Sequence, residues 1–156
     1  MQLPSGRIAT REVVEHPGAV AIVAITRDDK VLLLRQAHHP IQRVLLGLPA
    51  GTLEPGESLE ACARRELTEE TGYRAGTVTQ IASYFTSPGY TSEQLTIFLA
   101  EDCEFADGEI DPDELISVSP IGLSEIPAMV VPGPEQIQDA KTLIGLLLLC
   151  QLRGLR

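Results

Sequence analysis

Three glutamates near the middle of the chain have the spacing of a metal site on a helix. The segment that carries them reads as a helix, with Ser58 suited to the N-cap and Gly72 to the left-handed residue that ends it. On a helical wheel, Glu66 and Glu70 fall inside the apolar stripe, and Glu69 lies at its edge. Two carboxylates on the buried side of a helix repel each other and resist losing water. A divalent cation with oxygen ligands, such as Mg²⁺ or Mn²⁺, removes this conflict, whereas the alternative is an ordinary charged surface helix.

The stretch from Gly51 to Tyr73 resembles the Nudix box. That pattern is Gly, five residues, Glu, seven residues, Arg-Glu-Leu, one residue, Glu-Glu, one residue, Gly and an apolar residue. Only Tyr73 departs from it, because the family more often has an aliphatic residue there, at a packing position. Every other fixed position is present: Gly51, Glu57, Arg65, Glu66, Glu69, Glu70 and Gly72.

Nudix enzymes hydrolyse a nucleoside diphosphate that is linked to another group, and the resemblance implies the same reaction here. Water attacks a phosphorus atom of the pyrophosphate, while metal ions orient the phosphates and lower the pKa of water. The resemblance implies that Glu66 and Glu70 bind the metal, with Glu69 completing the site and the backbone carbonyl of Ala50 or Gly51 nearby. The position of Glu69 at the edge of the stripe also allows a solvent-facing role.

Arg65 and Glu57 are expected to support the loop of the box. Arg65 lies outside the apolar stripe, so we expect it to pair with a loop carboxylate such as Glu57 rather than to touch substrate. Glu57 is interpreted as an anchor for this loop, with direct metal ligation as the alternative.

A second resemblance, to the ADP-ribose pyrophosphatase branch, narrows the substrate. Leu48-Pro-Ala-Gly enters the box, a Ser-Pro-Gly loop leading to Glu93 follows it, and Asp139-Ala-Lys-Thr is also similar. The branch implies ADP-ribose as substrate, split into AMP and ribose 5-phosphate, with other nucleoside diphosphate sugars next. A plain tight turn is the alternative for the Ser-Pro-Gly loop. The implied substrate-binding residues are Arg35, Ser87, Pro88, Gly89, Tyr90 and Glu93.

In this branch a catalytic base usually comes from a mobile acidic loop, which corresponds here to residues 107–114. Glu114 aligns best with the position of this base, and Asp111 and Asp113 are alternates. The alternative interpretation is a solvated loop without a catalytic role. Gly108 would let such a loop close over substrate. Glu93 and the box glutamates are further candidates, and water held by the metal would make a separate base redundant.

The sequence departs from the branch in two places. The N-terminal region is shorter than the one that usually helps to form a dimer and an adenine-holding wall. His38 and His39 stand near where the branch often has Arg, and Gly47 stands where it often has Glu. The two histidines are interpreted as solvated loop residues, with phosphate-facing donors as the alternative. Candidates for stacking on adenine are Tyr84, Phe85 and Tyr90.

Composition bounds the kind of protein. The chain has 156 residues, a net charge of −10, 44% hydrophobic and 22% charged residues, which predicts one globular domain over 1–156 with a short polar extension at 1–12. The negative charge argues against nucleic acid as a partner. The most apolar run, Leu143–Leu149, is too short to span a bilayer, so no membrane partner is expected. Three cysteines without framework spacing predict free thiols and a cytoplasmic location. The resemblance and the apolar closing helix predict a homodimer.

Hydrophobic patterning predicts an α/β fold in which helices flank a mixed sheet, in agreement with the α/β/α sandwich that the Nudix resemblance implies. Beyond the box helix, a short helix is expected at 123–129, interrupted by Pro127, and a closing helix at Glu135–Leu152. Residues 36–43 and the acidic stretch 101–114 are expected to be connections. The expected strands are a short one at Val13-Val14 and longer ones at Ala19–Thr26, Lys30–Arg35, Thr77–Phe85, Leu95–Ala100 and Leu115–Ile121.

Two other functions fit parts of this pattern. One is hydrolysis of nucleoside triphosphates or dinucleoside polyphosphates, against which the Ser-Pro-Gly loop and the Asp139-Ala-Lys-Thr tail count. The other is a non-catalytic Nudix-fold sensor that binds ADP-ribose. Such sensors usually lose carboxylates of the box, and this sequence keeps all of them.

Overall fold

The computed structural model describes residues 2–106, 116–133 and 136–156. Its strands are β1 (Ala19–Thr26), β2 (Lys30–His38), β3 (Arg43–Gly47), β4 (Ala50–Thr52), β5 (Tyr73–Arg74), β6 (Thr77–Phe85), β7 (Gln94–Phe105) and β8 (Ile116–Gly122). Its helices are α1 (Leu59–Thr71), α2 (Ile126–Met129) and α3 (Ala140–Arg153), with 3-10 turns at His39–Ile41 and Leu123–Glu125.

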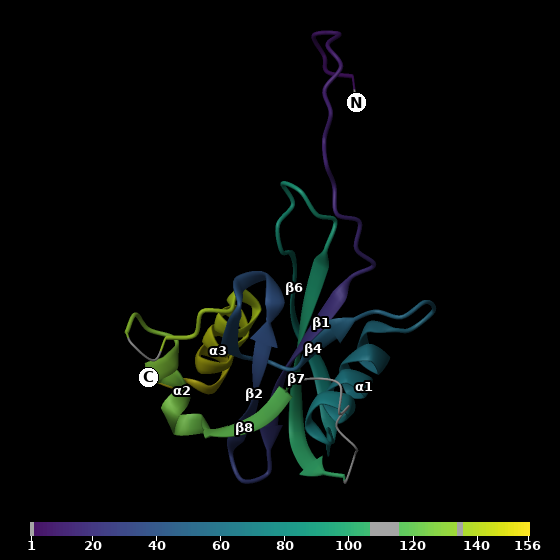
Figure 1. Cartoon of the computed structure of the whole chain (residues 1–156). Helices are drawn as coiled ribbons and strands as arrows, with labels where there is room; N and C mark the ends of the chain where they lie inside the picture. The colour runs from purple at the N-terminus through teal and green to yellow at the C-terminus, as the bar shows by residue number, and fades with distance from the viewer. Residues whose placement is uncertain (1, 107–115, 134–135) are drawn as a thin grey trace.

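The strands form one mixed sheet. Strand β1 pairs in parallel with β7 and antiparallel with β2 and β4, while β2 lies between β3 and β8. Strands β6 and β5 pair antiparallel with β7. Helix α1 covers one side of the sheet, and α2 and α3 cover the other (Figure 1). The predicted fold, a mixed sheet flanked by helices, is confirmed.

Strand β1 is buried on both faces, which explains its unbroken apolar sequence. Successive side chains of a strand point to opposite faces. Accordingly, Val20 and Ile22 belong to the core cluster that includes Leu67 of α1. Ala21 and Val23 belong to the other cluster, which includes Leu146 and Leu149 of α3. A strand that contributes to two cores has no solvent face on which to place polar residues.

Local chemistry sets both ends of α1 where the sequence predicts them. The Ser58 side chain accepts a hydrogen bond from the backbone N–H of Ala61, at 3.2 Å, and so caps the first turn. Gly72 ends the helix with φ 75°, a left-handed conformation that glycine adopts without steric cost. These two caps fix where the helix begins and ends, and its apolar residues Cys62, Ala63 and Leu67 face the sheet.

Two strands are longer than the sequence predicts. Strand β2 continues to His38 and forms a hairpin with β3, so residues 36–38 and 43 are not connections. Here β3 and β8 flank β2 on both sides, and backbone pairing holds the polar residues in the sheet. Strand β7 continues to Phe105 because β5 pairs with its end. The ring of Phe105 also meets Tyr73 edge-on, with centroids 5.5 Å apart.

Three further expectations are corrected. Helix α3 begins at Ala140, because the Asp139 side chain acts as the N-cap and accepts a hydrogen bond from the N–H of Thr142. The expected start of this helix, Glu135, lies outside the described residues. Residues 107–115 lie outside them as well. Pro127 lies in the first turn of α2, where it is tolerated, and does not interrupt a helix. The expected strand at Val13-Val14 is reduced to a single bridge between Val14 and Thr91.

The N-terminal segment and the hairpin between β6 and β7 extend together away from the body of the molecule (Figure 1). The N–H of Val14 donates to the carbonyl of Tyr90, at 2.8 Å, and the N–H of Ser92 donates to the carbonyl of Val14, at 3.1 Å. In the described part of the chain, no helix is long and apolar enough to cross a membrane.

Candidate active site

Two carboxylates of α1 converge on the start of β4. One oxygen of Glu70 accepts a hydrogen bond from the backbone N–H of Ala50, at 2.8 Å, and Glu70 is only 4% exposed. The Glu66 carboxylate lies over the next residue: a Cβ added to Gly51 would lie 1.8 Å from Glu66 Oε1. Because the two glutamates are one helical turn apart, α1 presents both to the same short backbone segment. We call Glu66 and Glu70 over Ala50–Gly51 the carboxylate cradle.

Arg65 joins the cradle to the loop that precedes α1. Its guanidinium forms a two-pronged ion pair with Glu57, at 2.9 and 3.0 Å. Its Nη1 atom also donates to Glu66, at 2.8 Å, and to Glu69, at 3.0 Å. The Arg65 guanidinium lowers the pKa of the Glu57 carboxyl from its ordinary value of 4.5 to about 2, mainly through their hydrogen bond. One arginine thus gathers three carboxylates around the cradle.

Glu69 occupies the outer edge of this arrangement. Its side chain is 55% exposed and turns toward Arg65, one helical turn earlier. Only Glu66 and Glu70 meet the backbone of β4, and Glu69 takes the solvent-facing orientation that its wheel position allows. We found no cluster of three or more His, Cys, Asp or Glu side chains arranged to hold a metal among the residues that the structure describes.

The cradle suits a hard divalent cation by its chemistry. Glu66 and Glu70 supply carboxylate oxygens, the ligands that Mg²⁺ and Mn²⁺ prefer. A side chain at Gly51 would fill the space that the Glu66 carboxylate occupies, so this glycine keeps the carboxylate close to the backbone. The Arg65 guanidinium lies beside Glu66, so a bound cation would either share the Glu66 carboxylate with Arg65 or displace Arg65 from it. The residues therefore fit such a group, with Glu66 and Glu70 as its holders.

The Ser-Pro-Gly loop lies at the outer end of the β6–β7 hairpin. It is a turn in which the N–H of Tyr90 donates to the carbonyl of Ser87, at 3.1 Å. Pro88, Gly89 and Tyr90 are exposed. Glu93 returns to the hairpin, where it accepts a hydrogen bond from the Thr86 hydroxyl at 2.6 Å. These predicted substrate residues come from a different part of the fold than the cradle.

Arg35 lies on β2, opposite Leu46 of β3 and Ser117 of β8. Side-chain alternation along β2 places Arg35 on the same face as Leu33, which belongs to the core cluster on the α3 side. The cradle lies on the α1 side. Glu114, the predicted base, lies outside the described residues.

The segment that enters the cradle is fixed in a way that sequence reasoning missed. Residues 48 and 49 lie between β3 and β4, and three elements hold them and Ala50. The N–H of Leu48 donates to the Thr142 hydroxyl of α3, at 2.8 Å, and the carbonyl of Pro49 accepts from Ile22 of β1, at 2.8 Å. Glu70 of α1 takes the N–H of Ala50. In the sequence, the spacing Asp139-x-x-Thr142 is typical of an N-cap and indicates that a helix starts there, although it does not indicate the contact with Leu48.

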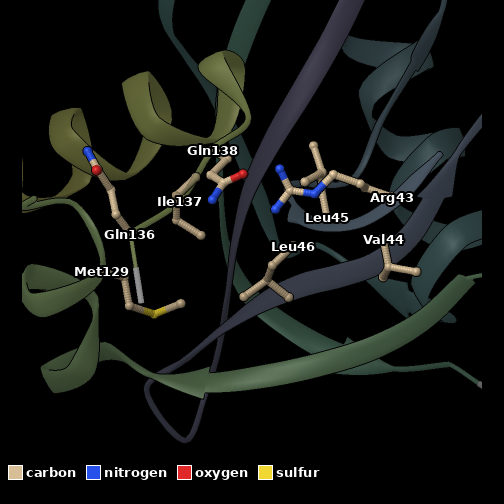
Figure 2. A pocket seen from close by; sticks show the side chains of 8 residues that line it. All are labelled: Arg43, Val44, Leu45, Leu46, Met129, Gln136, Ile137 and Gln138. Atoms are coloured by element: carbon tan, nitrogen blue, oxygen red, sulfur yellow. The ribbon is translucent and has the colours of Figure 1, made fainter. Parts of the chain in front are cut away.

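A cavity of about 180 Å³ opens on the α3 side of this segment. Leu46, Ile137 and Met129 give it apolar walls, and the guanidinium of Arg43 points toward Gln138 (Figure 2). Leu46 lies four residues before Ala50, so at most about 13 Å of backbone, at about 3.3 Å per extended residue, separates these two residues. The cavity combines apolar surface with amide and guanidinium donors.

The sequence profile of the NUDIX domain matches residues 15–141. The chain belongs to the Nudix family. An ADP-ribose pyrophosphatase of Bacillus subtilis (strain 168) is 40% identical over 144 residues, which cover 91% of this chain and 77% of the relative. A GDP-mannose pyrophosphatase of Yersinia enterocolitica (serotype O:8, biotype 1B) is 34% identical over 155 residues, covering 93% of this chain and 79% of the relative.

A solved structure described as a crystal structure of ADP compounds hydrolase has the same fold. It superimposes with a TM-score of 0.81 at 28% identity, over 98% of this chain and 83% of the other. The Nudix resemblance is thereby confirmed, together with its ADP-ribose pyrophosphatase branch. Three of the four residues of the cradle, Gly51, Glu66 and Glu70, belong to the Nudix box.

Proposed function

We propose that this Nudix protein hydrolyses the pyrophosphate bond of ADP-ribose, or of a closely related nucleoside diphosphate sugar, with a divalent metal ion. Water adds to one phosphorus atom, the bridging P–O bond breaks, and the products from ADP-ribose are AMP and ribose 5-phosphate. The observation that carries the proposal is the convergence of Glu66 and Glu70 on Ala50–Gly51. Similarity to an ADP-ribose pyrophosphatase over most of the chain supports the substrate.

We assign the metal to the cradle. Glu66 and Glu70 would hold Mg²⁺, with Mn²⁺ as a substitute, and Glu69 and the carbonyl of Ala50 complete the set. When bound there, the ion would neutralise charge on the phosphates and lower the pKa of water. Arg65 and Glu57 keep the loop of the box beside the cradle, because their two-pronged ion pair ties α1 to the residues before it.

The remaining predicted residues would act on the substrate rather than on the metal. We keep Arg35 and Glu93, together with the loop of Ser87, Pro88, Gly89 and Tyr90, as the proposed substrate-binding residues outside the cradle. Glu114 stays the predicted base.

A GDP-linked sugar is the second candidate substrate, because a GDP-mannose pyrophosphatase is also similar over most of this chain. Both substrates place a diphosphate between a nucleoside and a sugar, so the same cradle serves either. Purine and sugar recognition would differ outside it.

We further propose that residues 1–156 form a single domain and that the protein is a cytoplasmic homodimer. Exposed apolar side chains on the N-terminal segment and the β6–β7 hairpin support an interface there: Ile8, Val13, Val14, Phe85 and Tyr90. Three free cysteines, two of them buried, support a reducing compartment.

A substrate panel tests this proposal. Purified protein would be incubated with Mg²⁺ and ADP-ribose, GDP-mannose, nucleoside triphosphates or a dinucleoside polyphosphate, and the products would be separated by anion-exchange chromatography. We expect AMP and ribose 5-phosphate from ADP-ribose as the fastest reaction. Faster hydrolysis of triphosphates or dinucleoside polyphosphates would contradict the substrate assignment. ADP-ribose binding without turnover of any compound would instead identify a sensor.

A further inference from the structure

The backbone N–H of Leu48 has an unusual acceptor. Leu48 lies between β3 and β4, and its N–H donates at 2.8 Å to the hydroxyl of Thr142, a residue 94 positions later in the chain. Leu48 is 3% exposed and Thr142 is 0% exposed, so water does not compete for this bond. A buried N–H that loses its acceptor is costly, which makes the position of Leu48 depend on Thr142.

The direction of the Thr142 hydroxyl is set by Asp139. The hydroxyl donates its one proton to Asp139 Oδ2, at 2.5 Å, so toward Leu48 it acts as an acceptor. The same carboxylate oxygen caps the N–H of Thr142, at 3.1 Å, and the other oxygen pairs with Lys141, at 3.0 Å. A negatively charged acceptor polarises the hydroxyl and strengthens the bond that it accepts from Leu48.

Residues 48–51 form the short backbone segment that links the Thr142 contact to the cradle, and each of these residues has a contact that holds it. The carbonyl of Pro49 is fixed by Ile22, and the N–H of Ala50 is fixed by Glu70. Glu66 then lies against Gly51 with no space for even a methyl group between them. A shift of Leu48 toward or away from α3 is therefore transmitted to the two residues on which both carboxylates rest.

We propose that Asp139 and Thr142 form a positioning pair that fixes the backbone of residues 48–51 and thereby the spacing of Glu66 and Glu70. This inference rests on the proposed function, in which those two glutamates hold the metal. Neither Asp139 nor Thr142 touches the substrate or the metal; each acts through the backbone of Leu48. The start of α3, on one side of the sheet, thus sets the geometry of a site built by α1 on the other.

The test compares Thr142→Val, which removes the hydroxyl at nearly constant shape, with Thr142→Ser, which restores it. The first measurement is amide hydrogen exchange by NMR on metal-free protein. In Thr142→Val we expect faster exchange at Leu48 and also at Ala50, whose own hydrogen-bond partner, Glu70, is unchanged. Exchange at Ala50 should rise because local opening of this segment then costs less free energy.

The second measurement is Mn²⁺ binding followed by electron paramagnetic resonance. We expect Thr142→Val to weaken Mn²⁺ binding about tenfold and Thr142→Ser to bind within about twofold of the original protein. Ile126→Val is the control, because it thins the same core cluster from α2, an element that contributes no hydrogen bond to residues 48–50 among those described above. It should lower the melting temperature without changing Ala50 exchange or Mn²⁺ affinity.

The inference is overturned if Thr142→Val speeds exchange at Leu48 alone and leaves Ala50 and Mn²⁺ binding unchanged. It is also overturned if Thr142→Ser behaves like Thr142→Val. Should Thr142→Val fail to fold, Asp139→Asn serves instead, since it keeps the side-chain shape and an acceptor oxygen but removes the charge. We expect a smaller change in the same direction. An Asp139→Asn variant with unchanged exchange and Mn²⁺ binding would contradict the positioning pair. Failure of the proposed function is distinguishable, because it would appear as absent hydrolysis in the original protein while the exchange measurement remains readable.

Discussion

At the residue scale, Gly51 shows most directly how little space the cradle leaves. Replacing it with Ala would place a Cβ 1.8 Å from Glu66 Oε1, so the carboxylate has to move. Displacement of a reacting arrangement by about 1 Å costs on the order of 100-fold in rate. We therefore expect Gly51→Ala to lose at least about 100-fold in kcat.

The matched control for that variant is Gly133→Ala, whose new Cβ meets nothing within 4 Å. Hydrolysis of ADP-ribose and thermal unfolding would be measured for both proteins. Gly133→Ala should match the original protein in both. Full activity in Gly51→Ala would show that the Glu66 position seen here is not needed for the reaction.

Glu57 gives a prediction of how stability depends on pH. Its folded pKa is lowered from 4.5 to about 2 by Arg65, so the charged pair stabilises the folded state above pH 4.5 and is lost as pH falls from there through about 2. We expect Glu57→Gln to be less stable than the original protein at pH 7. The difference should shrink progressively between pH 4.5 and 2.

Urea unfolding at a series of pH values measures this difference. Glu60→Gln is the control, because Glu60 also pairs with an arginine, Arg64, but on an exposed side of α1. Exposed pairs contribute little, so its stability should follow that of the original protein closely. If Glu57→Gln lost the same free energy of unfolding at every pH, the ion pair with Arg65 would not be the source of that stability.

Sequence reasoning located the cradle but not all of its contacts. The helical wheel placed Glu66 and Glu70 inward because position on a helix depends only on spacing. It could not predict that Arg65 would also reach Glu66 and Glu69, because a long side chain chooses its partners from the folded loop around it. The contact between Thr142 and Leu48 joins residues 94 positions apart, beyond the range of any local pattern.

At the scale of the elements, Gly145 lets α3 approach the sheet. A Cβ there would lie 2.7 Å from Leu48 Cδ1 and 3.0 Å from Val23 Cγ2. Alanine in a helix interior is ordinarily about 1 kcal/mol more favourable than glycine. Here we expect Gly145→Ala to destabilise the protein, by about 1–3 kcal/mol, because the extra methyl overpacks the contact between α3 and β1.

Urea unfolding of Gly145→Ala beside Gln151→Ala checks this expectation. Gln151 is exposed on the same helix, so its replacement reports helix propensity without packing. A stabilised Gly145→Ala variant would show that Leu48 and Val23 yield easily, and that α3 is not tightly registered on the segment before the cradle.

Elements with a strong pattern of their own could be predicted from sequence, and those that depend on neighbours could not. Strand β1 has an unbroken apolar run and α1 has both caps, so each was located by local chemistry. The ends of β2 and β7 are strands only because β3, β8 and β5 pair with them. Their exposed polar residues carry no pattern that distinguishes them from a loop.

At the scale of the whole molecule, the exposed apolar residues of the N-terminal segment and hairpin predict self-association. We expect light scattering to give the mass of a dimer at micromolar concentration. Val14→Asp combined with Phe85→Asp should produce a monomer, because both side chains are more than half exposed on the extended part of the chain. Ile41→Asp, at an exposed site in the 3-10 turn after β2, is the control. A monomeric original protein would contradict this interface.

Metal-dependent hydrolysis at the cradle can be tested by measuring AMP release with and without metal. AMP release from ADP-ribose would be followed with and without Mg²⁺ for the original protein, Glu70→Gln and the surface control Glu60→Gln. We predict Mg²⁺-dependent AMP release that is unchanged in Glu60→Gln and falls by more than about 100-fold in Glu70→Gln, beyond what losing an outer partner of a metal ligand costs. Unchanged release in Glu70→Gln, or release that needs no divalent metal, would contradict metal-dependent hydrolysis at the cradle.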